Sequence, residues 1–263
     1  FHAIESLPYQ AILFLSFGGP DKPDDVIPFL ENVLRGRHVP KERMHEVAEH
    51  YFQFGGKSPI NEQNLALIGA IRRELDENGL SGLPIYFGNR NWHPLLGDTM
   101  SQMAADGVKR ALCLVTSSFS SYSGCRQYRE NILAARAAVG PKAPEIDKIR
   151  VWYNHPLFIE AMADRVREAL SKLAERERES AVITFTAHSI PMTMAITSEY
   201  VKQLKESCRL VAAAVGGHAH ELVYQSRSGP PQQPWLEPDI GDFIRERAAS
   251  GRKEALVVTP IGF

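Results

Sequence analysis

The hydrophobic pattern of the chain predicts two short strands that are buried on both faces. The first covers residues 11–17 (AILFLSF), and the second is the first half of residues 181–191 (AVITFTAHSIP). Unbroken runs of apolar and β-branched residues are typical of strands in the middle of a parallel sheet. Each run is closed by a proline, Pro20 or Pro191, which cannot continue a central strand. We therefore expect one parallel sheet around each run.

Helices and further strands are predicted around these two runs. Apolar residues at helical spacing, bounded by Gly or Pro, predict helices, and shorter apolar runs predict strands. The expected helices are residues 24–34, 41–54, 63–78, 96–105, a helix that ends near 139, and 199–215. The expected additional strands are residues 84–88, 110–116 and 148–153. This alternation of strands and helices is typical of an α/β fold.

The second half of the chain repeats the order of the first. Residues 106–116 (DGVKRALCLVT) align with residues 250–259 (SGRKEALVVT). Each segment is preceded by a helix, and before that by a strand with a polar exit, YFGNRNWHP at 86–94 and VYQSRSGPP at 223–231. The repeat predicts two similar doubly wound, Rossmann-like domains with parallel four-stranded sheets.

The expected domains cover residues 8–146 and 147–263. In the first half, the repeated strand is followed by a long loop, a helix and another strand, whereas the second half stops at Phe263. A parallel sheet needs helices on both faces. We therefore expect the second domain to be incomplete and the chain to be a C-terminally shortened protein.

Composition argues against several classes of protein. The formal net charge is −1, without long basic runs, which disfavours nucleic acid as a partner. No apolar stretch approaches the roughly 20 residues that span a bilayer, and the first ten residues lack the pattern of a signal peptide. Three cysteines do not make a disulfide framework in a chain of 263 residues. These features predict a cytoplasmic protein.

His188 is the first candidate for chemistry, because it directly follows the second buried run. Ligands of open α/β sheets bind beyond the carboxyl ends of the strands. The unperturbed pKa of histidine lies near neutral pH, so the side chain can act as a base or a metal ligand. The alternative is a histidine that closes the strand by bonding a nearby carbonyl, and the residues alone leave both open.

Charged and aromatic loop residues are further candidates. Arg35, Arg37 and Lys57 could bind carboxylates or phosphates, or they could be solvated loop charges. Tyr122 and Tyr128 could stack on a flat ligand, or they could pack as amphipathic surface. The sequence alone leaves these alternatives open.

Other motifs give weaker signals. Cys125 could ligate a metal or a cluster, but the other cysteines show no CxxC spacing. His218 and His220 form an HxH motif that could bind metal or lie on a solvent-facing turn. The GGP of residues 18–20 lacks the spacing of a nucleotide-binding loop, and residues 117–128 contain no GxSxG motif of serine hydrolases.

Seven motifs, in order along nearly the whole chain, closely resemble those of ferrochelatase, and most of all its actinobacterial type. They are LSFGGP (15–20), PFLENVLRGR (28–37), HYFQFGGKSPIN (50–61), YFGNRNWHP (86–94), FTAHSIP (185–191), YQSRSGPPQQPWLEPD (224–239) and TPIGF (259–263). The resemblance implies a chelatase-type fold of two domains, with a porphyrin held in the cleft between them while ferrous iron is inserted. Ferrous iron is then a substrate, and the reaction is the terminal lyase step of heme synthesis.

The likeness to the actinobacterial type favours coproporphyrin III as the porphyrin, with protoporphyrin IX as the alternative. The competing hypothesis is a non-catalytic protein that binds porphyrin or heme, or an inactive fragment. A related chelatase for cobalt and a corrin precursor is disfavoured by the SPIN and QSRSGPP motifs at residues 58–61 and 225–231.

The resemblance also assigns roles to individual residues. His188 corresponds to the histidine that accepts pyrrole protons and binds the metal. Phe17 stands where other members have a tyrosine or a methionine, and phenylalanine cannot ligate iron. The residues at positions that contact the porphyrin or its propionates are Phe17, Arg35, Tyr51, Ser58 and Tyr128, with Leu34 as the alternative to Arg35 and with His50 in place of an arginine.

Cofactors and partners follow from the same resemblance. Cys125 corresponds to the first ligand of a [2Fe-2S] cluster that some members hold, and the other three ligands would lie beyond Phe263. A glutamate that faces the key histidine in the family would lie there too. The expected partner is the porphyrin, bound by a monomer that binds no nucleic acid, and peripheral contact with a membrane is left open.

Overall fold

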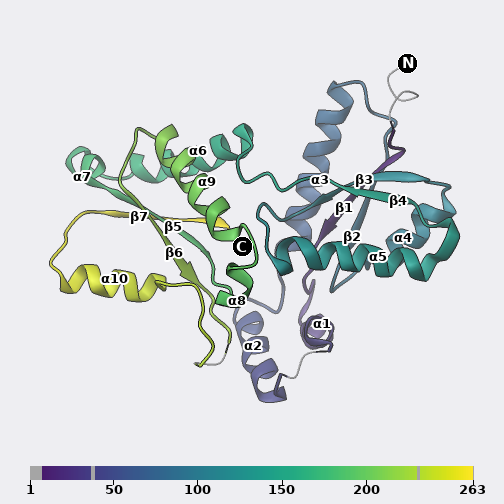
Figure 1. Ribbon diagram of the computed structural model, residues 1–263, viewed down its shortest axis with the longest axis horizontal. Helices are drawn as coiled ribbons and strands as arrows, with labels where there is room; N and C mark the ends of the chain where they lie inside the picture. Colours follow the sequence, from purple (N-terminus) through teal and green to yellow (C-terminus); the bar gives the residue numbers. More distant parts are fainter. Residues whose placement is uncertain (1–7, 37–38, 230–231, 263) are drawn as a thin grey trace. The chain divides into compact units, whose positions relative to one another are not determined.

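The computed structural model describes residues 8–36, 39–229 and 232–262 (Figure 1). The chain divides into two compact units. The first unit comprises Phe1–Thr116 and Tyr128–Ile149, and the second comprises Ser117–Gln127 and Arg150–Phe263. The segment 117–127 therefore belongs to the second unit, although the chain on both sides of it belongs to the first.

The first unit is built on a parallel sheet of four strands. These are β1 (Ala11–Ser16), β2 (Ile85–Asn89), β3 (Arg110–Val115) and β4 (Glu145–Lys148), in the order β2-β1-β3-β4. All six residues of β1 are buried, as expected for an apolar run in the centre of a sheet. The four-stranded parallel sheet predicted from the sequence is confirmed.

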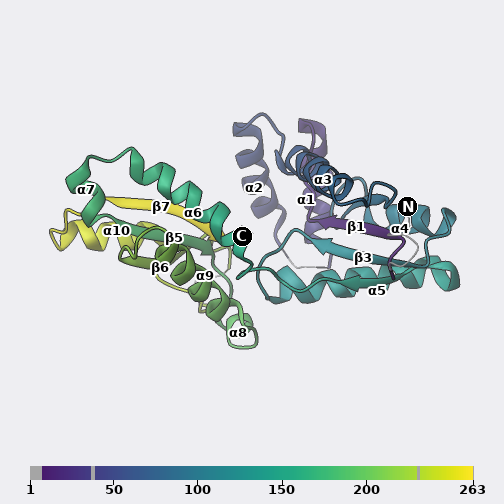
Figure 2. The ribbon, with the colours of Figure 1, turned by 90° about the horizontal axis from the view of Figure 1, so that it is seen from above.

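Helices cover both faces of this sheet. The helical elements of the unit are η1 (Pro23–Asp25), α1 (Val26–Leu34), α2 (Lys41–Gln53), α3 (Ile60–Glu77), α4 (Leu96–Ala105), α5 (Gln127–Val139) and η3 (Gly140–Lys142). Leu13 and Leu15 of β1 share a buried cluster with Met100 of α4 and Ile132 of α5. Figure 2 shows α3 on the side of the sheet opposite to α5. The unit is therefore doubly wound.

The second unit has a parallel sheet of three strands among the described residues. These are β5 (Val182–His188), β6 (His220–Gln225) and β7 (Leu256–Gly262), in the order β6-β5-β7. Its helical elements are η2 (Tyr122–Arg126), α6 (Pro156–Ser171), α7 (Glu175–Ser180), α8 (Met192–Ala195), α9 (Tyr200–Ala214) and α10 (Ile240–Ala249). The α/β class with two parallel sheets is confirmed, the second sheet having one strand fewer than the first.

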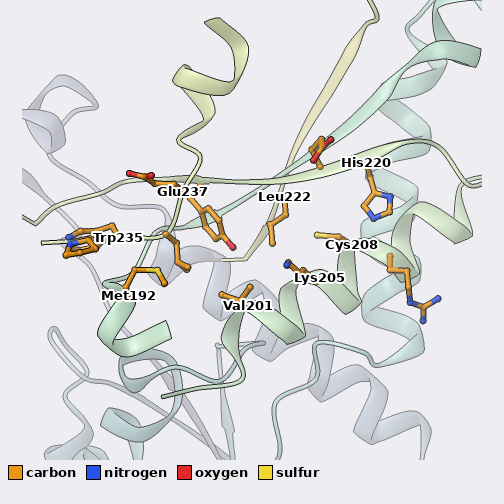
Figure 3. Close-up of a pocket in the computed structure, with 13 residues that line it drawn as sticks. Met192, Val201, Lys205, Cys208, His220, Leu222, Trp235 and Glu237 are labelled. Atoms are coloured by element: carbon orange, nitrogen blue, oxygen red, sulfur yellow. The ribbon is translucent and has the colours of Figure 1, made fainter. Parts of the chain in front are cut away.

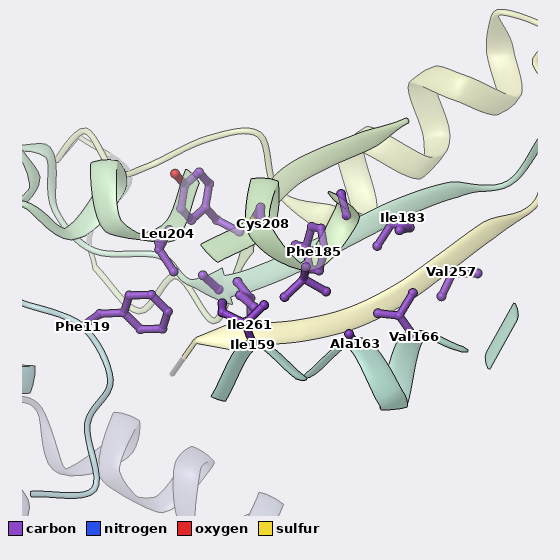
Figure 4. Packing of buried hydrophobic residues seen from close by; sticks show 14 of the residues in the cluster. Phe119, Ile159, Ala163, Val166, Ile183, Phe185, Leu204, Cys208, Val257 and Ile261 are labelled. Atoms are coloured by element: carbon purple, nitrogen blue, oxygen red, sulfur yellow. The ribbon is translucent and has the colours of Figure 1, made fainter. Parts of the chain in front are cut away.

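The core of the second unit forms on one face of its sheet (Figure 4). Phe185 of β5 packs in this cluster with Val166 of α6 and Leu204 of α9, all almost fully buried. Phe119, from the segment 117–127, inserts into the same cluster, and its ring meets that of Tyr200 edge to face at 6.1 Å. This insertion explains why the segment belongs to the second unit.

The sequence repeat appears as a repeat of structure. In both units the central strand is flanked by the strand that follows it and by the next one, giving β2-β1-β3 and β6-β5-β7. The backbone N–H of Asn89 in β2 donates to the carbonyl of Pro94 at 2.7 Å, and that of Tyr224 in β6 donates to Pro238 at 2.9 Å. Both prolines follow a cis peptide bond, and a helix begins two residues later in each case.

The strand expected at residues 148–153 is wrong. The structure places β4 three residues earlier, at Glu145–Lys148, where it pairs with β3 at the edge of the sheet. The strand was predicted from the mostly apolar residues 149–153, but the pairing of β4 with β3 ends at Lys148, which lies opposite Cys113. Pairing along an edge is held by backbone bonds and by the ion pair of Arg110 with Asp147 at 2.6 Å, neither of which needs an apolar run.

Candidate active site

His188 is the last residue of β5, where it pairs with Gln225 of β6. The six residues before it are buried, and its own side chain is half-buried. Its backbone carbonyl accepts a hydrogen bond from the Tyr200 hydroxyl at 3.0 Å. Burial lowers the pKa of the His188 imidazole below its ordinary value of 6.5, because desolvation disfavours the charged form. At neutral pH the side chain is therefore an uncharged base and a potential metal ligand.

The chain after His188 is fixed against the loop that follows β6. The backbone N–H of Met192 donates to the carbonyl of Pro234 at 2.9 Å, and that of Leu236 donates to Ile190 at 3.1 Å. The Ser189 hydroxyl donates to the carbonyl of Leu236 at 2.8 Å. These bonds hold the backbone on which the imidazole is mounted, which is what a positioned base requires.

A pocket of about 940 Å³ lies beside this loop, between α9, β6 and residues 234–237 (Figure 3). Trp235, Met192 and Glu237 lie at one end of it, and Cys208 and His220 lie toward the other. Of the candidates named from the sequence, His220 of the HxH motif lines the pocket, whereas His188 and the residues assigned to the porphyrin are not among its described lining residues. The pocket belongs to the second unit.

In the first unit, Phe17 and Tyr51 are brought together by one buried ring. Phe29 of α1 meets Phe17 edge to face at 6.2 Å and Tyr51 of α2 at 6.0 Å. Trp92, two residues after Arg90, completes the cluster at 6.3 Å from Phe29. Burial raises the pKa of the Tyr51 phenol, so this hydroxyl stays protonated near neutral pH.

Tyr128 is joined to Phe17 through an arginine that the sequence analysis did not single out. The Arg90 guanidinium lies 4.7 Å from the centroid of the Tyr128 ring and 5.6 Å from that of Phe17. Its Nε donates to Asn131 at 2.7 Å. The available signal was the polar exit NRNWHP that follows β2, because such exits lie at the carboxyl edge of the sheet.

Ser58 packs against the loop that leaves β1. Its backbone N–H donates to the carbonyl of Pro20 at 2.8 Å, and its hydroxyl accepts from the N–H of Ile60 at 3.3 Å. A Cβ placed on Gly19 would lie 2.7 Å from the Cβ of Ser58, so only glycine fits there. The first unit therefore brings Phe17, Tyr51, Ser58 and Tyr128 to the carboxyl edge of its own sheet.

Arg35 follows the end of α1 and is exposed, and its Nη2 donates to Asn32 at 2.6 Å. Lys57 is also exposed and forms an ion pair with Glu62, which matches the alternative of a solvated loop charge. Arg37, the third cation considered from the sequence, lies outside the described residues. The exposed Arg35 is therefore the described candidate best placed to meet a ligand carboxylate.

The cysteines do not assemble a cluster site among the described residues. Cys125 is half-buried in the short π-helical element η2. Cys113 and Cys208 lie in hydrophobic clusters, and burial raises the pKa of each thiol to about 12. No group of three or more His, Cys, Asp or Glu side chains suited to a metal is found in the described part of the chain. A [2Fe-2S] cluster needs four such ligands, and Cys125 is the one candidate that the described residues offer.

Both histidines of the HxH motif contact residues of the second unit. His220 packs edge to face against Phe185 at 6.1 Å, and the Nδ1 of His218 lies 3.3 Å from the carbonyl of Ala181.

Among the described helices, none is both long and apolar enough to cross a bilayer.

Comparison of the sequence with known proteins matches the chain to one family. The ferrochelatase family model matches residues 9–263. The chain is 59% identical over 256 residues to a ferrochelatase of Rhodopirellula baltica, an alignment that covers 97% of this chain and 72% of the relative. It is 53% identical over 262 residues to the coproporphyrin III ferrochelatase of Nocardia farcinica, with 97% and 74% covered, and 52% identical over 278 residues to that of Streptomyces coelicolor, with 99% and 74% covered. The chain therefore belongs to the ferrochelatase family, the lyases that insert ferrous iron into a porphyrin for heme synthesis.

Proposed function

We propose that this chain inserts ferrous iron into coproporphyrin III, with His188 as the acceptor of the pyrrole protons. The substrate follows the named activity of two relatives that are 53% and 52% identical to the chain. The observation that carries the proposal is the position of His188, uncharged and held at the carboxyl end of the central strand β5.

The chemistry requires a base of this kind. A free-base porphyrin carries two N–H protons, and both must leave when its four nitrogens bind Fe²⁺. A neutral imidazole can accept the first proton and must release it to water before it accepts the second. The lowered pKa of His188 favours that release and keeps the neutral form available at pH 7.

We assign porphyrin binding to Phe17, Arg35, Tyr51, Ser58 and Tyr128. The rings of Phe17 and Tyr51 meet the same Phe29 ring and offer apolar and aromatic surface for the macrocycle. Arg35 offers a guanidinium to a propionate carboxylate. Phe17 has no atom that can ligate iron, and we assign a metal contact to His188.

Three finer expectations stay predictions. We propose that the two units correspond to the chelatase domains expected at residues 8–146 and 147–263. A cluster with Cys125 as one ligand would need three further ligands that the described residues do not supply. We also propose a monomer, and a peripheral membrane contact that the exposed rings of Phe52 and Phe54 near the end of α2 support, Phe54 being 82% exposed.

A second candidate function is porphyrin binding without turnover. The observation that favours it is Phe17, because this residue supplies aromatic surface and no ligand atom. A protein of this type would bind porphyrin tightly and leave it free of metal. The retained, uncharged His188 favours catalysis instead.

Anaerobic absorbance spectroscopy tests the proposal. The full chain is mixed with ferrous iron and either coproporphyrin III or protoporphyrin IX, and the loss of the free-base spectrum is followed. We expect a kcat/KM at least roughly tenfold higher for coproporphyrin III. Preferential metallation of protoporphyrin IX would contradict the substrate, and binding of both without metallation would establish the second candidate.

A further inference from the structure

Arg35 stands at the point where helix α1 ends. Its backbone N–H donates to the carbonyl of Asn32 at 3.4 Å, and its side chain is exposed. An exposed arginine has many rotamers, and ordering one of them on a ligand carboxylate costs conformational entropy. A contact that selects one rotamer before the ligand arrives reduces that cost.

Asn32 makes this contact without changing the charge. Its Oδ1 accepts a hydrogen bond from the Arg35 Nη2 at 2.6 Å. The bond uses one of the five N–H donors of the guanidinium and leaves the others to bind oxygen atoms elsewhere. Because asparagine is neutral, the pair keeps a full positive charge, whereas an aspartate at the same place would cancel it.

The amide of Asn32 is itself held from the other side. Its Nδ2 donates to the backbone carbonyl of Asn91 at 3.2 Å. A flipped amide would place its oxygen against that carbonyl and its NH₂ against the guanidinium, so both neighbours select the same orientation. Asn32 therefore presents its oxygen to Arg35.

The hydrogen bonds continue from Asn91 to Phe17, the residue directly after β1. Asn91 is 8% exposed, and both its backbone N–H and its Nδ2 donate to the carbonyl of Phe17, at 3.1 and 3.2 Å. A continuous set of hydrogen bonds thus runs from the exposed guanidinium of Arg35, through Asn32 and Asn91, to the first residue after β1. Its members come from three separate parts of the chain.

We propose that Asn32 is a positioning residue that orients Arg35 toward a porphyrin carboxylate. The proposal rests on the proposed function, since coproporphyrin III supplies the carboxylates that Arg35 binds. Asn32 itself acts only through the arginine. Asn32 therefore strengthens the binding of a porphyrin with ionised propionates and does not affect the binding of a porphyrin without them.

A double-mutant cycle tests the inference. The variants are Asn32→Ala, Arg35→Ala, the double variant and the isosteric Asn32→Asp, and the dissociation constants of coproporphyrin III and of its uncharged tetramethyl ester are measured by fluorescence. The control is Asn78→Ala, because Asn78 also lies at a helix end but bonds only within its own helix, to Glu74. Melting curves confirm that each variant is folded.

We expect Asn32→Ala to weaken binding of coproporphyrin III by roughly threefold to tenfold and to leave ester binding unchanged. In the Arg35→Ala background the same substitution has no further effect. Asn32→Asp weakens binding at least as much as Asn32→Ala, because it adds a negative charge beside Arg35. The control matches the wild type for both porphyrins.

Independent losses from Asn32→Ala and Arg35→Ala, or an equal loss for acid and ester, would overturn the inference. Should Asn32→Ala not fold, the neutral variant Asn32→Ser decides, and a loss from it that persists in the Arg35→Ala background counts against positioning. A wild-type chain that metallates coproporphyrin III beside variants with unchanged affinity overturns this inference alone. A wild-type chain that binds no coproporphyrin III overturns the proposed function as well.

Discussion

Phe17 and His188 occupy equivalent positions in the two repeats. Ser16, the residue before Phe17, pairs with Asn89 of β2, whose N–H donates to the carbonyl of Pro94. Ala187, the residue before His188, pairs in the same way with Tyr224 of β6, whose N–H donates to the carbonyl of Pro238. This position is an apolar ring directly after β1 in one repeat, and an imidazole at the last residue of β5 in the other. We propose that the same backbone position serves substrate contact in one unit and proton transfer in the other.

This equivalence predicts the behaviour of a variant at Phe17. Phe17→Leu keeps an apolar side chain, loses the edge-to-face contact with Phe29 and removes no iron ligand. We expect kcat to stay within about threefold of the wild type while KM for the porphyrin rises, because uniform binding is lost. Steady-state metallation kinetics check this. A collapse of kcat with unchanged KM would show that Phe17 acts in the chemical step.

The lowered pKa of His188 predicts the acid limb of the pH profile. In the proposed mechanism the neutral imidazole is the active form, and burial lowers its pKa below 6.5. The value of kcat/KM should therefore fall with a midpoint below pH 6.5, since this parameter reports the free enzyme. An acid limb centred above pH 6.5 would mean that another group, or a raised His188 pKa, controls the rate.

The same shift has a consequence for stability. Between pH 6.5 and the lower pKa of the folded state, the unfolded chain binds a proton at His188 that the folded chain does not. This contribution is complete above pH 6.5 and is lost as the pH falls through the folded pKa. His188→Gln should remove that loss. The free energy of unfolding of the wild type, measured in urea, should therefore fall relative to that of the variant as the pH falls from 7 to 5. A difference between the two that does not change with pH would contradict the shift.

Gly229 should not tolerate a side chain. A Cβ there would lie 2.4 Å from the Trp235 ring, which is held beside Pro191 by a strand-like bridge. We expect Gly229→Ala to cost about 1–3 kcal/mol of the free energy of unfolding and to alter the tryptophan fluorescence. The control is Gly97→Ala in α4, where nothing lies within 4 Å and helix propensity predicts a gain of up to about 1 kcal/mol. Equal stability of both variants would refute the crowding.

The central strands could be predicted from the sequence because their surroundings are uniform. Every residue of β1 is buried, as are the first six of β5, so an apolar run was a sufficient signal. The edge strand β4 could not be found in this way, since its sequence EIDK is held by pairing with β3. The position of such an edge strand depends on its pairing with residues that are distant in the sequence.

The candidate site shows the same difference between residues with a local sequence signal and residues that depend on long-range contacts. His188 was singled out because a polar residue after an apolar run is a local signal, and the resemblance to ferrochelatase supplied the roles of Phe17 and Tyr128. Arg90 and Asn32 were missed, because their roles depend on contacts with residues 38 and 59 positions away, Tyr128 and Asn91. Only the folded chain brings these groups together.

The most direct test of the account is the effect of His188→Ala on metallation and on porphyrin binding, measured side by side under anaerobic conditions. The control is His155→Ala, because His155 is an exposed histidine whose ring caps the start of α6. We predict that His188→Ala lowers kcat by roughly a hundredfold or more while the dissociation constant of coproporphyrin III changes by less than about threefold. A variant that still inserts iron at the wild-type rate, or one that loses porphyrin binding to the same extent as turnover, would contradict the role of His188 as proton acceptor.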